Sequence, residues 1–278
     1  MKKISRRSFL AAAGLSVAAL ALTACGGSAS SVASSVASSA SSAAASTSAA
    51  AGELTTVEAG KLTMATNAAF PPYEMTTDAG DFEGIDIETA QAIADKLGLE
   101  LQIDDMDFDA ALLSVQQGKA DIVMAGVTVT DERKAVMDFS DSYATGIQSI
   151  IVPEGSDIAS PDDLAGKKIG TQRGTTGYIY CSDDFGDDSV VAYDDGLTAV
   201  QALNNGQVDA VVIDNAPAQE FIAANPGLKI LDTSYAEEDY AIGMAKNSPL
   251  EDAVNSVLEE LKADGTLQAI VDKYITAE

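Results

Sequence analysis

The first candidate for chemistry is an arginine close to the start of a predicted helix. The segment Gly126-Val127-Thr128-Val129-Thr130-Asp131-Glu132-Arg133 follows an apolar stretch, and Thr130 is expected to cap a helix whose first turn contains Arg133. Positive charge is unfavourable near the N-terminus of a helix. Arg133 is therefore either a solvated surface residue or a residue that faces a planar anion, which a guanidinium can hold through two parallel hydrogen bonds.

A second candidate is the glycine-rich segment Gly170-Thr171-Gln172-Arg173-Gly174-Thr175-Thr176-Gly177, which follows a predicted strand and opens a predicted helix. The free backbone N–H groups at such a turn suit an anion. The segment has the spacing of neither GxxxxGK[ST] nor GxGxxG, so a carboxylate is favoured over a nucleotide.

Asp214 supplies the opposite charge at the end of another predicted strand. An arginine, a glycine-rich turn and an aspartate together suit a zwitterion, and an α-amino acid is such a ligand. Phe70 and Phe108 are aromatic residues at the exits of two further strands, where they would enclose a small side chain. The alternative for both rings is packing in the core.

The composition excludes many enzyme classes. The chain has no His and no Trp, which removes His-based acid/base catalysis, Ser-His-Asp and Cys-His nucleophiles and imidazole zinc sites. Its two cysteines, Cys25 and Cys181, cannot form a CxxC site, and Cys181 is expected to be a small buried residue. The run Asp105–Asp109 begins like an EF-hand, but Ala110 and Gln116 replace the required Gly and Glu. We predict no catalytic residue, no metal site and no cofactor.

The charge balance also excludes partners. The chain has 16 Lys and Arg against 43 Asp and Glu, a formal net charge of −27. Nucleic acid is excluded as a partner because binding a polyanion relies on a basic surface. An anionic membrane surface would repel the chain in the same way.

The elements that must position these residues alternate between strands and helices, which predicts an α/β fold. Residues 61–67 are expected to form a strand. Apolar residues at helical spacing predict a helix over Asp86–Leu97 that ends at Gly98. Asp109 is expected to cap a second helix that runs to Gln117, and residues 122–125 are expected to form a buried strand.

Two segments of the chain follow the same plan. Residues 110–126 align with residues 198–214, and both segments are predicted to contain a helix, a Gly stop, an Asp and a buried strand. We infer two lobes joined by extended segments near Gln148–Val152 and Tyr240–Gly243; a chance recurrence of helix-Gly-strand units is the alternative. The alignment places Gly126 and Asp214 at the carboxyl ends of equivalent strands, where open α/β sheets bind ligands.

The N-terminal region is predicted to be an export signal and a tether. Residues 1–24 combine Lys2, Lys3, Arg6 and Arg7 with an uncharged Ala- and Leu-rich run, the pattern of a cleaved signal peptide. Ser5–Leu10 resembles a twin-arginine signal, and Leu22-Thr23-Ala24-Cys25 resembles a bacterial lipoprotein box, which implies lipidation of Cys25. Residues 26–52 contain only Gly, Ser, Ala, Val and Thr, a composition typical of a flexible tether.

The motifs of the remaining chain resemble those of the polar amino-acid binding proteins of ABC importers, the type II periplasmic binding protein class. The resemblance extends from about Leu62 to Tyr274 and rests on consecutive motifs. These are Ala65-Thr66-Asn67-Ala68-Ala69-Phe70-Pro71-Pro72-Tyr73, Phe82-Glu83-Gly84-Ile85-Asp86-Ile87, Met106-Asp107-Phe108, Thr128-Val129-Thr130-Asp131-Glu132-Arg133, Asp138-Phe139-Ser140-Asp141, Gly174-Thr175-Thr176-Gly177 and Val208-Asp209-Ala210-Val211-Val212-Ile213-Asp214.

The resemblance implies a role for each of these positions. Arg133 would pair with the ligand α-carboxylate, aided by Thr128, Thr175 and Thr176. Asp214 and the Gly126 carbonyl would hold the α-ammonium. Phe70 and Phe108 would stack on the ligand side chain, and Asn67 and Gln172 would face its far end. Position 67 is often Asp in relatives that bind cationic or amide ligands. Because this chain has Asn67 instead, the resemblance does not identify which amino acid is bound. Arg173 receives no role.

The resemblance also implies an architecture and partners. Residues 53–148 and 244–278 would form one lobe and residues 149–243 the other, joined by a two-strand hinge. The protein would be a monomer, anchored by lipidated Cys25 to the outer face of the cell membrane, that delivers an amino acid to a permease and its ATPase. The alternatives are a dehydratase of the same fold acting on prephenate-like acids, and a surface sensor or adhesion module that binds an amino acid without transporting it.

Overall fold

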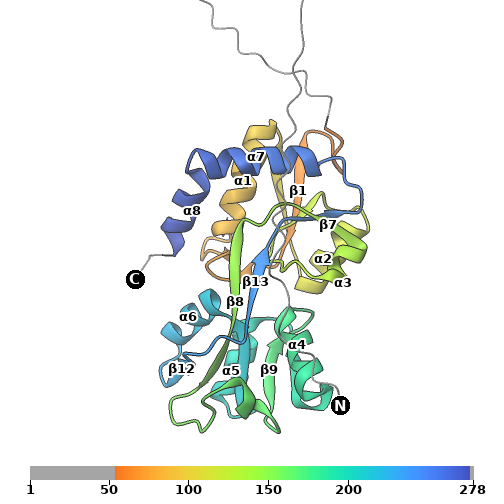
Figure 1. The fold of residues 1–278 in the computed structure, drawn as a ribbon. Helices are drawn as coiled ribbons and strands as arrows, with labels where there is room; N and C mark the ends of the chain where they lie inside the picture. Colours follow the sequence, from red (N-terminus) through yellow and green to blue (C-terminus); the bar gives the residue numbers. More distant parts are fainter. Residues whose placement is uncertain (1–53, 276–278) are drawn as a thin grey trace, which may run out of the picture. The chain divides into compact units, whose positions relative to one another are not determined.

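The computed structural model describes residues 54–275. The predicted signal peptide, the predicted lipidation site at Cys25 and the predicted tether lie outside the described residues. Strands and helices alternate along the described chain, as predicted for an α/β fold, and build two larger sheets and one small one (Figure 1). Within residues 54–275, no helix combines the length and the apolar character that crossing a membrane requires.

The first lobe is built on a five-stranded mixed sheet of order β5-β1-β6-β14-β7. Strand β1 is parallel to β5 and β6, and β14 is antiparallel to β6 and β7. The strands are β1 (Lys61–Thr66), β5 (Glu100–Asp105), β6 (Ile122–Val123), β7 (Met137–Phe139) and β14 (Gly243–Ala245). The helices are α1 (Ile85–Leu97), α2 (Phe108–Gln116), α3 (Asp131–Val136), α7 (Glu251–Ala263) and α8 (Thr266–Tyr274).

This sheet is buried on both faces. Leu62 and Met64 of β1 pack in one apolar cluster with residues of α1 and α7, and Ala65 packs in a second cluster with residues of α2. Successive side chains of a strand point to opposite faces, so β1 contributes buried side chains to both faces of the sheet, two of them the threonines Thr63 and Thr66. The predicted strand at residues 61–67 is confirmed.

The second lobe is built on a sheet of order β10-β9-β11-β8-β12, with β13 paired to β8. The parallel strands β10, β9 and β11 are antiparallel to β8. The strands are β8 (Ala144–Pro153), β9 (Ile169–Gln172), β10 (Val190–Tyr193), β11 (Ala210–Asp214), β12 (Leu228–Ile230) and β13 (Ala236–Tyr240). The helices are α4 (Thr176–Phe185), α5 (Gly196–Asn204), α6 (Asn215–Ala224) and the 3₁₀ turns η1 (Pro161–Leu164) and η2 (Asp187–Ser189).

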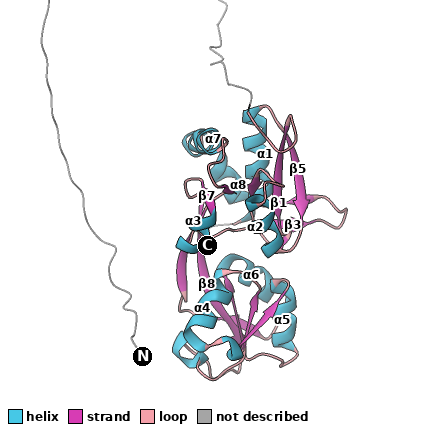
Figure 2. Cartoon of the chain, turned by 90° about the vertical axis from the view of Figure 1, so that its right-hand side faces the viewer, coloured by secondary structure: helices cyan, strands magenta, loops and turns pink. Residues whose placement is uncertain are grey.

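The second sheet is also covered on both faces, by α4 on one side and by α5 on the other (Figure 2). Val212 of β11 packs in a cluster with Cys181 of α4, whereas Val211 packs with Val200 of α5. Adjacent residues of one strand thus contribute to opposite faces, which explains why the sequence reads as an unbroken apolar run.

Strands β8 and β13 connect the two lobes and run side by side between them (Figure 1). Their ladder pairs Ala144–Gln148 with residues 236–240 in antiparallel register. The predicted connecting segment at Gln148–Val152 is itself paired to β11 and β12, so the ribbon that leaves the second sheet is the preceding part of β8.

A small antiparallel sheet of β2 (Ala69–Phe70), β3 (Glu74–Thr76) and β4 (Phe82–Glu83) lies between β1 and α1 along the chain. It brings the side chain of Glu74 into the interior, where none of its surface is exposed.

The predicted helix at residues 86–97 is confirmed, with Gly98 in the left-handed conformation at its end. The predicted cap at Asp109 is wrong. Helix α2 begins at Phe108 after Asp107, because the carbonyl of Asp107 accepts the first helical bond from the Ala111 amide at 2.9 Å. The strand predicted at residues 122–125 ends at Val123, although the Met124 amide still donates to the Ala65 carbonyl.

The two aligned segments have the same local geometry. The Gly118 amide donates to the Val115 carbonyl and the Gly206 amide to the Leu203 carbonyl, both at 3.0 Å. Each helix-Gly-strand unit therefore ends its helix in the same way and delivers its strand into the middle of a sheet.

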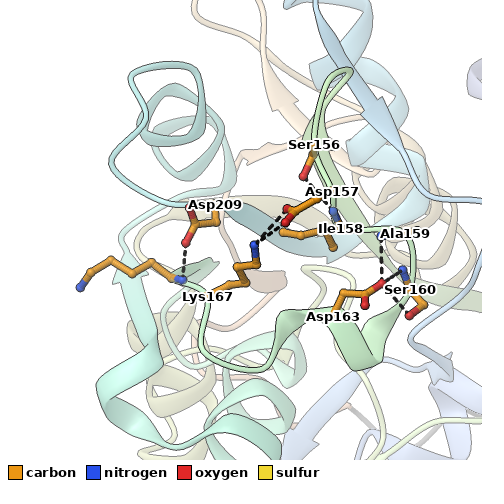
Figure 3. Close-up of polar contacts among 9 residues, drawn as sticks. Ser156, Asp157, Ile158, Ala159, Ser160, Asp163, Lys167 and Asp209 are labelled. Carbon is orange, nitrogen blue, oxygen red and sulfur yellow. Dashed lines mark hydrogen bonds and ion pairs between the residues drawn. The ribbon is translucent and has the colours of Figure 1, made fainter.

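The connection from β8 to β9 is held by short-range polar contacts at the surface of the second lobe (Figure 3). The Lys167 ammonium donates to Asp157 at 2.9 Å, and Asp163 and Ser160 form a capping box at η1. Asp209 accepts a hydrogen bond from the Lys168 amide at 2.7 Å and so joins this connection to the start of β11.

Candidate ligand-binding site

The ten predicted ligand-binding residues all line one cavity of about 310 Å³, part of which is open to solvent. The cavity lies at the carboxyl ends of strands from both sheets, where ligand sites of open α/β sheets occur. Two residues that the sequence did not indicate, Glu74 and Ala125, also line it. The predicted residues in its wall are Asn67, Phe70, Phe108, Gly126, Thr128, Arg133, Gln172, Thr175, Thr176 and Asp214.

Arg133 is a buried cation without a carboxylate partner among the described residues. Thr130 caps α3 by accepting from the Arg133 amide, which sets the side chain in the first turn. Its guanidinium donates to the Thr128 carbonyl at 2.8 Å and to the Gly174 carbonyl at 3.2 Å. The side chain is 8% exposed, and no ion pair within residues 54–275 includes it. Burial lowers its pKa, and the charge of Glu238 opposes that shift.

Phe108 lies beside this cation. The ring is buried at the first residue of α2, and its centroid is 5.4 Å from Cζ of Arg133. A guanidinium at this distance is attracted by the ring face. The ring thus helps to hold Arg133 at the cavity wall, a role that the sequence did not indicate.

Asp214 is a buried carboxylate with neutral partners. It is the last residue of β11 and precedes α6, and it accepts from the Gln148 amide at 2.7 Å and from the Tyr240 hydroxyl. Burial raises the pKa of Asp214 to about 7, and the hydrogen bond from Tyr240 opposes that shift. Within residues 54–275, Asp214 therefore has no cationic partner, just as Arg133 has no anionic one.

Glu238 of β13 connects residues of both lobes, and sequence analysis missed it. One carboxylate oxygen accepts from the hydroxyl of Thr128 at 3.1 Å, the hydroxyl of Thr176 at 3.0 Å and the side-chain amide of Gln148 at 3.0 Å. Its other oxygen has no hydrogen-bond partner among the described residues. A hydroxyl has one hydrogen, so these two threonines turn lone pairs rather than donors toward the cavity.

The glycine-rich turn leads into α4. Thr175 caps this helix by accepting from the Tyr178 amide at 3.3 Å. Within residues 54–275, the first-turn amides of Thr176 and Gly177 have no hydrogen-bond partner, as is usual at a helix N-terminus. Both amides are available to an anion held by Arg133.

The opposite end of the cavity is neutral and joins the two lobes. The Gln172 amide donates to the Asn67 side-chain oxygen at 2.8 Å and to the Asp194 carbonyl at 3.2 Å. The Asn67 amide donates to the Met106 carbonyl at 3.0 Å. Phe70 also lines the cavity, next to Gly126. Its ring leaves no room for a side chain at Gly126, whose Cβ would lie 2.9 Å from it.

Residues 62–277 match the model of a family described as "Bacterial extracellular solute-binding proteins, family 3". The chain belongs to this family.

Curated relatives and solved structures agree with this assignment. This solute-binding protein is 33% identical over 226 residues to the L-cystine-binding protein TcyJ of Escherichia coli K12, covering 80% of this chain and 85% of the relative. It is 32% identical over 230 residues to the arginine-binding extracellular protein ArtP of Bacillus subtilis, covering 78% and 87%. The arginine-, lysine-, histidine-binding protein ArtJ of Geobacillus stearothermophilus superposes with a TM-score of 0.75 at 34% identity, covering 78% and 96%.

Glu74 is a second buried acidic residue that sequence analysis missed. It lines the cavity, and neither of its carboxyl oxygens has a hydrogen-bond partner within residues 54–275. It follows the motif Phe70-Pro71-Pro72-Tyr73 directly. That adjacency was the available signal, but one acid among 43 does not stand out without knowledge of its burial.

Two residues of the solute-binding protein that sequence analysis left without a role lie outside the cavity wall. The Arg173 guanidinium is about half exposed and pairs with Asp194 at 3.3 Å. Cys181 is a free, fully buried thiol in the apolar cluster against α4, as predicted, and burial raises its pKa to about 12. A thiol with such a pKa stays protonated and packs as a small apolar side chain.

Proposed function

We propose that this chain is the substrate-binding component of an ABC importer for a polar L-amino acid, which it holds between its two lobes. The observation that carries the proposal is that two buried residues of opposite charge, Arg133 and Asp214, line one cavity. Among the described residues, neither of them has a partner of opposite charge. Burial of unpaired charges is costly. A zwitterion would neutralise both charges at once.

The geometry favours one orientation of the amino acid. Its α-carboxylate would face Arg133 and the first-turn amides of α4, and its α-ammonium would face Asp214 and the Gly126 carbonyl. The hydroxyl hydrogens of Thr128 and Thr176 are committed to Glu238. We therefore assign the Thr128 hydroxyl to the ammonium as an acceptor, whereas the family resemblance alone assigned it to the carboxylate.

The ligand side chain would extend between Phe70 and Phe108 toward the amide pair of Asn67 and Gln172. The side chains of Asn67 and Gln172 supply carbonyl and amide groups and carry no charge. A polar side chain with hydrogen-bonding groups suits this pair. Relatives whose names specify cystine, arginine, lysine and histidine support amino acids as the ligand class without selecting one.

Binding would be coupled to closure of the lobes, with residues 53–148 and 244–278 in one lobe and 149–243 in the other. Arg133 lies in the first lobe and Asp214 in the second, so a ligand contacts both only when the lobes are together. Its differential affinity for that arrangement would supply the free energy of closure.

We further propose export, lipidation of Cys25 at the outer face of the cell membrane, a monomeric state and delivery to a permease with its ATPase.

The test is a thermal-shift screen of the purified protein against the twenty amino acids and prephenate, followed by calorimetric titration of each hit. A ligand that binds the folded state raises its melting temperature. Recovery of the amino acid unchanged would support a receptor. Consumption of prephenate would instead make the protein an enzyme. If an amino acid stabilises the protein, but the protein does not restore uptake of that amino acid into membrane vesicles that contain the permease, the result would favour a sensor. Lipidation is tested separately by mass spectrometry of the wild type and Cys25→Ala.

A further inference from the structure

Four carboxyl groups are buried around the cavity, against one buried guanidinium. Glu74 and Asp86 have no exposed surface, and Asp214 and Glu238 are 8% and 7% exposed. Arg133 is the only Lys or Arg with a buried side chain in the described part of the chain. If every carboxyl group were ionised, the empty site would hold an excess of negative charge that burial makes unfavourable.

Glu74 is the least compensated of these groups. It faces the cavity from β3, and both of its oxygens lack hydrogen-bond donors among the described residues. Its neighbour Asp86, at the start of α1, accepts from the Gly126 amide at 3.0 Å through one oxygen, and its other oxygen has no hydrogen-bond partner in the part of the chain that the structure describes. Through this bond, Asp86 holds the turn at Gly126, a residue that lines the cavity.

The charged groups that act most strongly on Glu74 are all acidic. Asp86 of α1, Asp214 of β11 and Asp105 of β5 add negative charge. Burial, and next the charge of Asp86, raise the pKa of Glu74 well above its ordinary value. The phenols of Tyr73 and Tyr143 are the other titratable groups that interact with this pair, and burial chiefly raises the pKa of each.

Burial also raises the pKa values of Asp86 and Asp214. Burial raises the pKa of Asp86 to about 6, opposed by the Gly126 amide. The pKa of Asp214 is about 7, opposed by hydrogen bonds from Tyr240 and Gln148 and raised further by Glu238. The empty site thus holds protons near neutral pH that the same carboxyl groups would not hold in water.

We propose that Glu74 is a further residue of the ligand site, and that the ammonium of a bound amino acid replaces a proton that the empty site holds among Glu74, Asp86 and Asp214. The inference rests on the proposed function. The balance is simple: a protonated site and a cationic ammonium give the complex and one proton released to solvent, with no covalent bond to the ligand formed or broken. A ligand without the ammonium, such as a 2-hydroxy acid, leaves the proton in place.

Proton release makes affinity depend on pH. Below the raised pKa values the ligand must displace protons, so the association constant rises with pH and levels off above them. Glu74 contributes because its carboxyl faces both the cavity and Asp86. Replacing it by the isosteric amide removes one titrating group and relieves the repulsion that keeps its neighbours protonated.

The experiment is calorimetric titration of the purified protein at pH 6.5 with L-arginine, L-lysine and L-cystine, and with any further hit of the thermal screen. Each titration is repeated in buffers of different ionisation enthalpy. The slope of the observed enthalpy against the buffer enthalpy counts the protons exchanged. We expect release of about half to one proton per amino acid bound. Glu74→Gln should reduce this number, and Glu83→Gln, an exposed acid on the adjoining strand β4, should leave it unchanged.

Binding with no proton exchange, or with proton uptake, overturns the inference while the proposed function stands. An unchanged release in Glu74→Gln overturns the assignment to Glu74. Binding of no amino acid at all rejects the proposed function itself. Circular dichroism checks that Glu74→Gln folds. If it does not, Asp86→Asn takes its place, because loss of the Asp86 charge should reduce the protons held by Glu74.

Discussion

Gly174 and Asp109 approach each other so closely that a Cβ atom added to Gly174 would lie 1.7 Å from Oδ1 of Asp109. Gly174 belongs to the turn before α4 in the second lobe, and Asp109 to the first turn of α2 in the first. The same glycine has a φ of +74° and accepts a hydrogen bond from Arg133 through its carbonyl. The contact between the lobes therefore depends on the absence of a side chain at residue 174.

Gly174→Ala should weaken amino-acid binding, because the methyl group displaces Asp109 and the positive φ is strained. The strain alone costs about 1 to 2 kcal/mol. The double variant Gly174→Ala/Asp109→Ala removes the collision and keeps the strain, so it should recover part of the lost affinity. Calorimetric titration measures both. Wild-type affinity in Gly174→Ala would show that the two residues do not approach each other in the bound protein.

Arg133→Lys should lower amino-acid affinity by about 2 to 5 kcal/mol, at least about 30-fold. Lysine keeps the charge but cannot donate to the Thr128 and Gly174 carbonyls while also presenting a planar pair of donors to a carboxylate. Arg173→Lys is the matched control, since that guanidinium is half exposed and pairs with Asp194. Equal effects of the two substitutions on the dissociation constant would remove Arg133 from the site.

Glu238→Gln should weaken amino-acid binding about 10-fold, because a buried hydrogen bond to a charged group contributes about 1.5 to 3 kcal/mol. The uncharged amide no longer favours the ammonium, and the hydroxyls of Thr128 and Thr176 are freed to donate. Discrimination between an amino acid and its 2-hydroxy analogue should therefore shrink. Glu237→Gln, on the exposed face of β13, is the control. An equal loss of affinity for both ligands would limit Glu238 to a structural role.

The ligand-free protein should lose stability as pH rises from about 4 to about 7. The pKa of Asp214 is raised to about 7 from 3.8, and that of Asp86 to about 6. In this window the folded state binds more protons than the unfolded state, so the free energy of unfolding falls with pH. Asp214→Asn should flatten this dependence by a few kcal/mol at most. Urea unfolding at pH 5 and pH 8 measures the difference, and parallel pH profiles of the two proteins would contradict it.

Local features of the fold were predictable because they depend on neighbouring residues. The apolar spacing over residues 86–97 and the stop at Gly98 placed α1, and the hydroxyl of Thr130 placed the start of α3. The cap of α2 was predicted incorrectly at Asp109, since Asp107 and Asp109 are both acceptable caps by residue type. The backbone bond from Ala111 to the Asp107 carbonyl selects the first.

The sequence predicted those residues of the candidate site whose charge is unusual for their position in a helix or strand. Arg133 in the first turn of a helix and Asp214 at the end of an apolar strand are exceptions to local preference, and both line the cavity. Glu74 and Glu238 are acids in segments where the sequence offers many acids. Their local surroundings resemble those of exposed neighbours such as Glu83 and Glu237.

The sequence by itself determined the alternation of strands and helices, the absence of histidine chemistry and the separate positions of an arginine, a glycine-rich turn and an aspartate. The tertiary structure alone decided that these positions share one cavity, that the Gln172 amide meets Asn67 between the lobes, and that four carboxyl groups are buried near this cavity. The physical reason is that secondary structure follows from interactions a few residues apart, whereas burial and the resulting cost of charge arise from packing between elements distant in sequence.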